Sequence, residues 1–281
     1  MTAVAPALRA GLGRGLIELR QAFTGMELVN QLLWPVATLA AVFFLRDIAI
    51  GSTGYRLGTI ILPGALGMFV ALGALLVVQQ LAADREDGTL LRAKASPNGI
   101  RAYLIGKLVQ ISATILAYLA IILIPGVFLV SGLEIADPTS WITFAWVLLL
   151  GLVATQTIGA MLGSVVATPR GAGYLSLPVL GLIAISGIFA PITGLPDWLQ
   201  WIAQVFPVYW LGLGMRASFL PDEAAIVEIG ESWRHLETAA VLGAWAVVGL
   251  VLAPVVLRRM ARRESGSSVA RRRERAMQRV G

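Results

Sequence analysis

Residues 57–83 read LGTIILPGALGMFVALGALLVVQQLAA, an unbroken stretch without a charged side chain. A helix needs roughly 20 apolar residues to cross the ~30 Å hydrocarbon core of a bilayer, because each residue adds about 1.5 Å. This stretch is long enough to cross a membrane and to continue beyond it. The charged residues that follow, from Asp84 to Asp87, mark where the chain leaves the hydrocarbon. The stretch therefore predicts a membrane-spanning helix.

Further uncharged stretches of comparable length occur along the chain. They lie at residues 28–45, 108–133, 138–169, 171–196, 198–215 and 238–257. Of the 281 residues, 57% are hydrophobic and only 14% are charged, which is far from the composition of a soluble domain. The segments between the stretches are too short to form a core of their own. We therefore predict an all-α membrane protein whose function resides in its spans and loops.

The stretch at 198–215 differs from the others in its chemistry. It is rich in tryptophan, it contains Pro207, and turn-forming residues including Pro191 and Pro196 precede it. Tryptophan and tyrosine favour the membrane interface, where an apolar ring meets a wet edge. We interpret residues 191–216 as an external re-entrant hairpin before the last span, and we expect it to form part of an outer gate. The predicted gate residues are Phe189, Pro191, Pro196, Trp198, Trp201 and Pro207.

The distribution of basic residues supports six transmembrane helices and a cytoplasmic location for both termini. With six spans and the amino end inside, 18 basic residues lie in cytoplasmic segments and only four outside. Basic residues concentrate on the cytoplasmic side of membrane proteins. A seventh span would move the arginines of the carboxyl-terminal tail outside. The same bias explains the net charge of +6, so we expect a lipid bilayer as partner and no nucleic acid.

The two ends of the chain carry different signals. Apolar residues at steps of three and four along residues 1–27 predict a cytoplasmic amphipathic leader that lies as a helix in the interface. Three glycines weaken that helix, so a disordered leader is the alternative. The transmembrane domain then covers residues 28–257, and an Arg-rich cytoplasmic tail covers residues 258–281. The excess of arginine over lysine suggests a GC-rich bacterial genome, and hence a bacterial cytoplasmic membrane.

Several kinds of chemistry are missing from the sequence. None of the uncharged stretches contains an aspartate, glutamate, lysine, arginine or histidine that could bind a coupling ion. The sequence has no GxxxxGK[ST] phosphate loop and no cysteine. His235 and Glu231 could share a helical face as metal ligands, but we interpret His235 as an exposed histidine of a charged loop. We therefore expect no catalytic residue, no metal and no cofactor in this chain.

Polar residues within the spans are few. Thr155, Gln156 and Thr157 form the most polar group. They either line a path for an amphipathic cargo or bond to neighbouring backbone. Small residues also recur at every fourth position in this span. This ridge consists of Thr155, Gly159, Gly163 and Ala167, and it permits either close packing within the bundle or a dimer face.

The cytoplasmic connection at residues 84–100 carries the strongest functional signal. We expect the second span to continue as a helix to about Ala95, where Pro97-Asn98-Gly99 signals a turn. The sequence here combines a charged cluster, Gly-Thr-Leu, Ser-Pro and Gly-Lys, and it resembles the permeases of ABC-2 type exporters. The matching residues are Glu86, Gly88, Thr89, Leu90, Ser96, Pro97, Gly106 and Lys107. Asp84, where the family more often has Glu, and Lys94-Ala95, where Leu-Leu is common, depart from the pattern.

A second match lies before the last span. Residues 187–191, 195–200, 206–207 and 215–216 resemble the external hairpin of the same family. The order of leader, spans and loops agrees along the whole chain. The resemblance implies a permease subunit that pairs with a second permease chain, as homodimer or heterodimer. It also implies separate ATPase subunits that bind ATP and magnesium, because this chain lacks a phosphate loop.

The resemblance also assigns roles to residues. The implied ATPase-coupling residues are Asp84, Arg85, Glu86, Asp87, Gly88, Thr89, Arg92, Ser96 and Pro97. Leader residues contact the ATPase in family members, which makes Arg9, Arg14, Glu18 and Arg20 secondary candidates. The alternative for the segment from Asp84 to Arg92 is an ordinary charged loop that serves topology only.

The cargo is inferred from what the spans contain. Apolar surface with scattered hydroxyl groups favours export of a hydrophobic or amphipathic small molecule, such as an antibiotic or drug. This corresponds to multidrug efflux or antibiotic resistance. A lipid-linked glycan is the alternative cargo in the family. A non-transport scaffold subunit and an ATP-independent carrier are the alternatives outside it.

Overall fold

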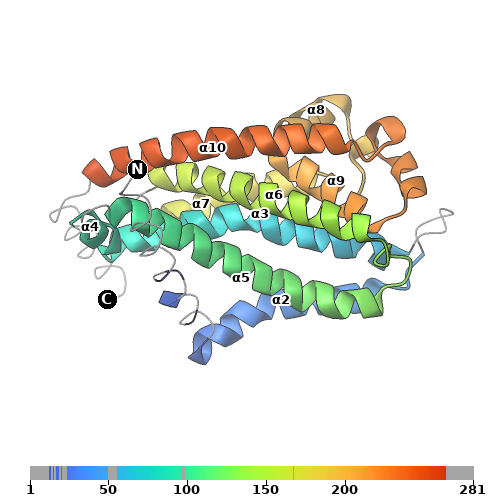
Figure 1. The fold of residues 1–281 in the computed structure, drawn as a ribbon, viewed down its shortest axis with the longest axis horizontal. Coiled ribbons are helices and arrows are strands. Elements are labelled where there is room, and N and C mark those ends of the chain that lie inside the picture. Colours follow the sequence, from blue (N-terminus) through green and yellow to red (C-terminus); the bar gives the residue numbers. More distant parts are fainter. Residues whose placement is uncertain are drawn as a thin grey trace.

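The computed structural model describes residues 13, 15, 17–18, 20, 24–49, 56–95, 99–166 and 168–263. This part of the chain is 85% helix and contains no strand. The helices run roughly along one long axis and form an elongated bundle (Figure 1). The elements are α2 (Gly25–Leu45), α3 (Leu57–Glu86), α4 (Thr89–Lys94), α5 (Gly99–Leu129), α6 (Pro138–Val165), α7 (Pro169–Ile185), η1 (Ile192–Gly194), α8 (Asp197–Val205), α9 (Pro207–Phe219), η2 (Asp222–Val227), η3 (Ile229–Glu231) and α10 (His235–Arg263). The prediction of a helical protein is confirmed.

Among the described residues, five helices are long and apolar enough to cross a membrane, namely α2, α3, α5, α6 and α10. The predicted span at 171–196 corresponds to α7, which has 17 residues. At about 1.5 Å per residue this helix is shorter than the ~30 Å hydrocarbon core. It stops at Ile185 because Gly187 adopts a φ of +69°, which no helix tolerates. The sixth span therefore stays a prediction.

The stretch at 198–215 does not form one helix. Helix α8 has 9 residues and α9 has 13, and neither is long enough to cross a bilayer. Phe206, with φ −95° and ψ 151°, separates them. Pro207 occupies the first turn of α9, where its missing N–H costs nothing. This agrees with the interpretation that residues 198–215 do not form a seventh membrane-spanning helix. Their re-entrant path stays a prediction.

Helix α3 occupies the centre of the bundle. In its apolar window 72% of the residues are buried, against 11% for α2. It contacts α5, α6, α7 and α9, and Figure 1 shows it running through the middle of the molecule. The outer helices expose large apolar side chains, such as Trp34 and Phe44 of α2 and Leu177 of α7. Such surfaces suit lipid rather than water.

The small-residue ridge of α6 faces α3 of the same chain. A Cβ added at Gly159 would lie 2.3 Å from the carbonyl oxygen of Ala74, and one at Gly163 would lie 3.2 Å from Cα of Val78. Small residues let two helix backbones approach this closely. In the described part of the chain, the ridge therefore serves packing within the bundle.

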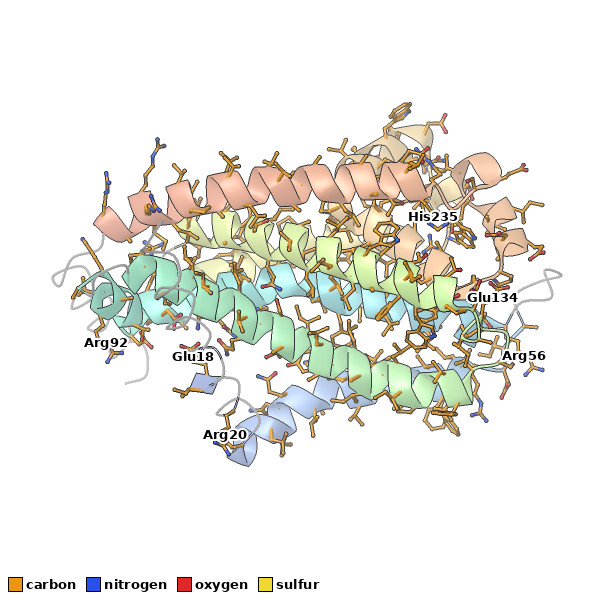
Figure 2. The ribbon with its side chains drawn as sticks, viewed as in Figure 1. Glu18, Arg20, Arg56, Arg92, Glu134 and His235 are labelled. Atoms are coloured by element: carbon orange, nitrogen blue, oxygen red, sulfur yellow. The ribbon has the colours of Figure 1, made fainter. Side chains whose placement is uncertain are left out.

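Charge separates the two ends of the bundle. One end, here called the basic end, carries Arg92 and Lys107 together with the arginines at the end of α10. Figure 2 shows Glu18, Arg20 and Arg92 there, and Arg56, Glu134 and His235 at the opposite end. That opposite, acidic end holds nine acidic residues and only four basic residues. The structure thus brings together the segments that the sequence assigns to each side of the membrane.

Candidate functional site

The turn between α3 and α4 lies at the basic end. Helix α3 ends at Glu86, and the N–H of Asp87 still donates to the carbonyl of Ala83 (3.0 Å). Gly88 then adopts a φ of +79°, a left-handed conformation that favours glycine. The prediction that the helix continues to Ala95 was therefore wrong, because this glycine turns the chain.

Polar groups organise the turn and its outward face. The carboxylate of Asp87 accepts a hydrogen bond from the N–H of Thr89 (2.7 Å), the first residue of α4. Arg92 donates to the hydroxyl of Thr89 (3.0 Å). Asp87 and Arg92 are exposed and Glu86 is half-buried. These three charged side chains form what we call the coupling face. The predicted coupling residues Ser96 and Pro97 lie outside the described residues.

Asp84 takes part in a partly buried network and does not belong to the coupling face. Its carboxylate accepts a hydrogen bond from the hydroxyl of Tyr103 and lies 3.0 Å from Nζ of Lys107. The same ammonium lies 3.0 Å from the carboxylate of Glu18. The network joins the end of α3 to the start of α5 and to the leader. Sequence reasoning missed it, although the spacing of four between Tyr103 and Lys107 puts both on one face of α5.

Arg85 also faces the interior of the bundle. Its guanidinium donates to the carbonyls of Ser164 and Val166. These carbonyls end α6, so the arginine satisfies groups that a helix terminus leaves unpaired. Among the secondary candidates, Arg20 is exposed, while Arg9 and Arg14 lie outside the described residues.

Helix α4 is attached to its surroundings. Leu90 and Ala93 are buried, and α4 contacts α3, α5 and α10. Nζ of Lys94 donates to the carbonyl of Arg262 near the end of α10 (3.2 Å). Displacement of the coupling face would therefore move the ends of several membrane helices together.

The polar residues of α6 are already hydrogen-bonded. The hydroxyl of Thr155 donates to Gly151 (2.8 Å) and that of Thr157 to Val153 (2.8 Å), both backbone carbonyls one turn earlier. Gln156 donates to the hydroxyl of Ser112 on α5 (2.8 Å). Bonding to the backbone, one of the two alternatives for these threonines, is therefore present.

Two cavities lie beside these residues. The first, here called the large cavity, has a volume of about 510 Å³ and lies among α3, α6, α7, α10 and the junction of α8 with α9. Its walls are almost entirely apolar, and Thr155 contributes a hydroxyl. The second, here called the basic-end cavity, has a volume of about 290 Å³ and lies among α3, α5, α6 and α10. Thr157 is part of its wall.

A buried ion pair organises the acidic end. Arg216 on α9 is 1% exposed and Glu228, between η2 and η3, is 3% exposed. Nε of Arg216 donates to the carboxylate of Glu228 (2.8 Å), and Nη1 donates to the carbonyls of Gly187 and Ile188. Arg216 thus ties α9 to the turn after α7 and to the loop before α10. The sequence analysis identified Arg216 only as part of the segment that resembles the family's external hairpin, and it did not predict the pairing with Glu228.

The predicted gate residues differ in their surroundings. Trp198 and Trp201 on α8 are 62% and 73% exposed, so they face away from the bundle. Pro207 is buried at the start of α9. The turn that contains Phe189 packs on α3, because a Cβ at Gly64 would meet the Phe189 ring at 3.1 Å. The remaining two, Pro191 and Pro196, flank the short helix η1. Their role in gating stays a prediction.

The helices and the two ends of the bundle together define a class of protein. The chain is a multi-pass helical membrane protein. It has a charged turn at one end and, at the other end, loops that the ion pair of Arg216 with Glu228 holds together. Among the described residues, no cluster of acidic residues and histidine could hold a metal. Glu231 and His235 do not share a helical face, because α10 begins at His235 and both Glu231 and Arg234 adopt a positive φ.

The family follows from the comparison with family models. The model described as ABC-2 family transporter protein matches residues 49–254, and the chain belongs to this family. The match runs from the loop before α3 to the second half of α10. It confirms the resemblance found in the sequence motifs. The family is a membrane component of transporters. The comparison with individual curated proteins gives no match.

Proposed function

We propose that this chain is the permease subunit of an ATP-driven exporter in a bacterial cytoplasmic membrane, with its basic end and both termini in the cytoplasm. Separate ATPase subunits supply ATP and magnesium binding, and a second permease chain completes the transporter. The cargo is a hydrophobic or amphipathic small molecule of the antibiotic or drug type. Family membership and the separation of charge between the two ends support this assignment.

The continuity of α3 is the observation that carries the proposal. Its 30 residues run without a break from the acidic end through the core to the coupling face. At about 1.5 Å per residue the helix is roughly 45 Å long. A partner that binds Glu86, Asp87 and Arg92 can therefore displace the central helix as a rigid body. ATP-driven closure of two ATPases would shift the populations of inward-open and outward-open states through this helix.

The large cavity supports the class of cargo. Its volume of about 510 Å³ falls in the range of small-molecule sites, roughly 300–1,000 Å³. The side chains around it are apolar apart from the hydroxyl of Thr155. A charged cargo would lose its hydration there without compensation. A neutral lipophilic molecule carries no charge whose hydration must be replaced, so the cavity suits it better.

Charge reversal on the coupling face tests the partnership with an ATPase. We expect the double variant Glu86→Lys, Arg92→Glu to insert and fold normally, because Arg92 is exposed and Glu86 is only half-buried at the basic end. Its efflux of Nile red in proteoliposomes containing the copurified ATPase should fall by about tenfold, since like charges would then meet across the contact and repel each other. The matched control is Glu223→Lys, an exposed residue of the acidic end. Undiminished efflux by the double variant would show that this face does not couple.

A substitution within the large cavity tests the cargo site. Leu182 lines this cavity, so Leu182→Trp should fill part of it. The Nile red concentration that half-maximally stimulates ATP hydrolysis should rise by about tenfold, as expected for a lost apolar contact. Leu177→Trp is the control, because Leu177 lies on the same helix and is 71% exposed. Equal stimulation of both variants and the unmodified protein would place the cargo elsewhere, or favour a lipid-linked glycan or a scaffold function.

A further inference from the structure

The basic-end cavity differs from the large cavity in what lies at its edge. Along α10 it is lined by Leu250, Ala253, Pro254, Leu257 and Arg258, which share one helical face. The first four are apolar, so this wall offers no polar group to hold water. From Leu250 to Arg258 the wall extends eight residues, or about 12 Å along the helix. The cavity is therefore an apolar slot that ends at a cation.

The charge of Arg258 is uncompensated within the described part of the chain. The side chain is exposed, and no ion pair joins it to another described residue. One turn further, Arg262 adds a second positive charge, and Lys94 reaches the carbonyl of that residue. Lys107 also lines the cavity, but Asp84 and Glu18 neutralise its ammonium. The positive rim of the slot is thus formed by Arg258 and Arg262 at the end of α10.

An acyl chain with an anionic headgroup matches both parts of this site. The slot excludes charge, whereas arginine binds phosphate oxygens through paired hydrogen bonds. Basic pockets between membrane helices are suited to anionic lipid headgroups. We propose that the basic-end cavity binds one acyl chain of an anionic phospholipid whose phosphate pairs with Arg258. This inference rests on the membrane location of the protein and not on transport.

Other occupants fit less well. The chain's own tail, residues 264–281, carries five arginines and two glutamates, so Arg258 and Arg262 repel it on balance. A neutral phospholipid fills the slot but leaves the positive rim without a partner. The proposed cargo has its own cavity, which α7 and the α8–α9 junction line in place of α5. Of these occupants, only the anionic phospholipid packs against the apolar wall and also pairs with the charge of Arg258.

Native mass spectrometry of the purified full-length chain in detergent tests this site. The probes are dioleoyl phosphatidylglycerol, which is anionic, and dioleoyl phosphatidylcholine, which is neutral. We expect the unmodified protein to retain more of the anionic lipid. Arg258→Gln should weaken retention of the anionic lipid by roughly fivefold, as expected for one basic residue near a charged headgroup, and should leave the neutral lipid unaffected. Arg259→Gln is the matched control, because Arg259 is exposed and does not line the cavity.

A second pair of variants tests the slot itself. Ala253→Phe places a large side chain in the cavity and should reduce retention of the anionic lipid. Val255→Phe is the control, because Val255 is 45% exposed and lies on another face of α10. Equal retention of the two lipids, equal loss in the two arginine variants, or full retention by Ala253→Phe would each overturn the proposal. If Ala253→Phe fails to fold, the comparison of Arg258→Gln with Arg259→Gln tests the proposal by itself.

Discussion

Replacing Glu228 with glutamine is expected to lower the free energy of unfolding by about 3–5 kcal/mol, the usual cost of removing one partner of a buried ion pair. Arg216 would keep its charge at 1% exposure and lose its only acidic partner among the described residues. The loop before α10 and the turn after α7 should both loosen, because Arg216 holds both. The measurement is unfolding of the purified protein by SDS in mixed micelles.

Two further variants make this prediction specific. Glu223→Gln removes an exposed carboxylate from the neighbouring η2 helix and should change stability by less than about 0.5 kcal/mol. The double variant Arg216→Met, Glu228→Leu removes both charges and should recover much of the loss, because apolar replacements of buried pairs are often neutral. A Glu228→Gln protein as stable as Glu223→Gln would mean that the ion pair does not hold this end together.

Replacing Gly159 with alanine is expected to cost about 3 kcal/mol, the upper part of the range for overpacking. The new Cβ would lie 2.3 Å from the carbonyl oxygen and 2.8 Å from Cα of Ala74. Both atoms belong to the backbone of α3, so no side-chain rotation relieves the contact. Helices α3 and α6 must separate, and these two form one of the most extensive contacts in the bundle.

Gly243 provides the matched control for this substitution. It lies inside α10, and a Cβ there meets no atom within 4 Å. Gly243→Ala should stabilise the protein by roughly 0.5–1 kcal/mol, because alanine loses less backbone entropy in a helix. The two substitutions are chemically identical and should shift the SDS midpoint in opposite directions. A shift of the same sign and size would show that α6 does not pack closely on α3.

The prediction of helices was most accurate where it depended on local sequence. Uncharged length predicted α3, α5, α6 and α10, whose apolar windows the structure contains as single helices. It was less accurate for the end of α3, because one left-handed glycine, Gly88, outweighs the helical preference of the residues after it. It also did not reveal that the stretch after Trp198 breaks at Phe206.

The candidate site was only partly visible in the sequence. The motif around Gly88 located the coupling segment, but it did not distinguish the outward Glu86 and Arg92 from the inward Asp84 and Arg85. That distinction depends on where α5 begins and where α6 ends, because these ends supply the partners of Asp84 and Arg85. The cavities could not be predicted from the sequence either, because each is lined by residues of at least four elements.

The sequence by itself determined that this is a helical membrane protein of the ABC-2 type, with its charges confined to two ends. Hydrophobic length and charge position are local properties, and a bilayer imposes them on each segment separately. Only the tertiary structure decided that Lys107 pairs with Asp84, that Arg216 pairs with Glu228, and that the small residues of α6 face α3. These contacts depend on which helices become neighbours, and neighbours are chosen by packing between segments that no local pattern specifies.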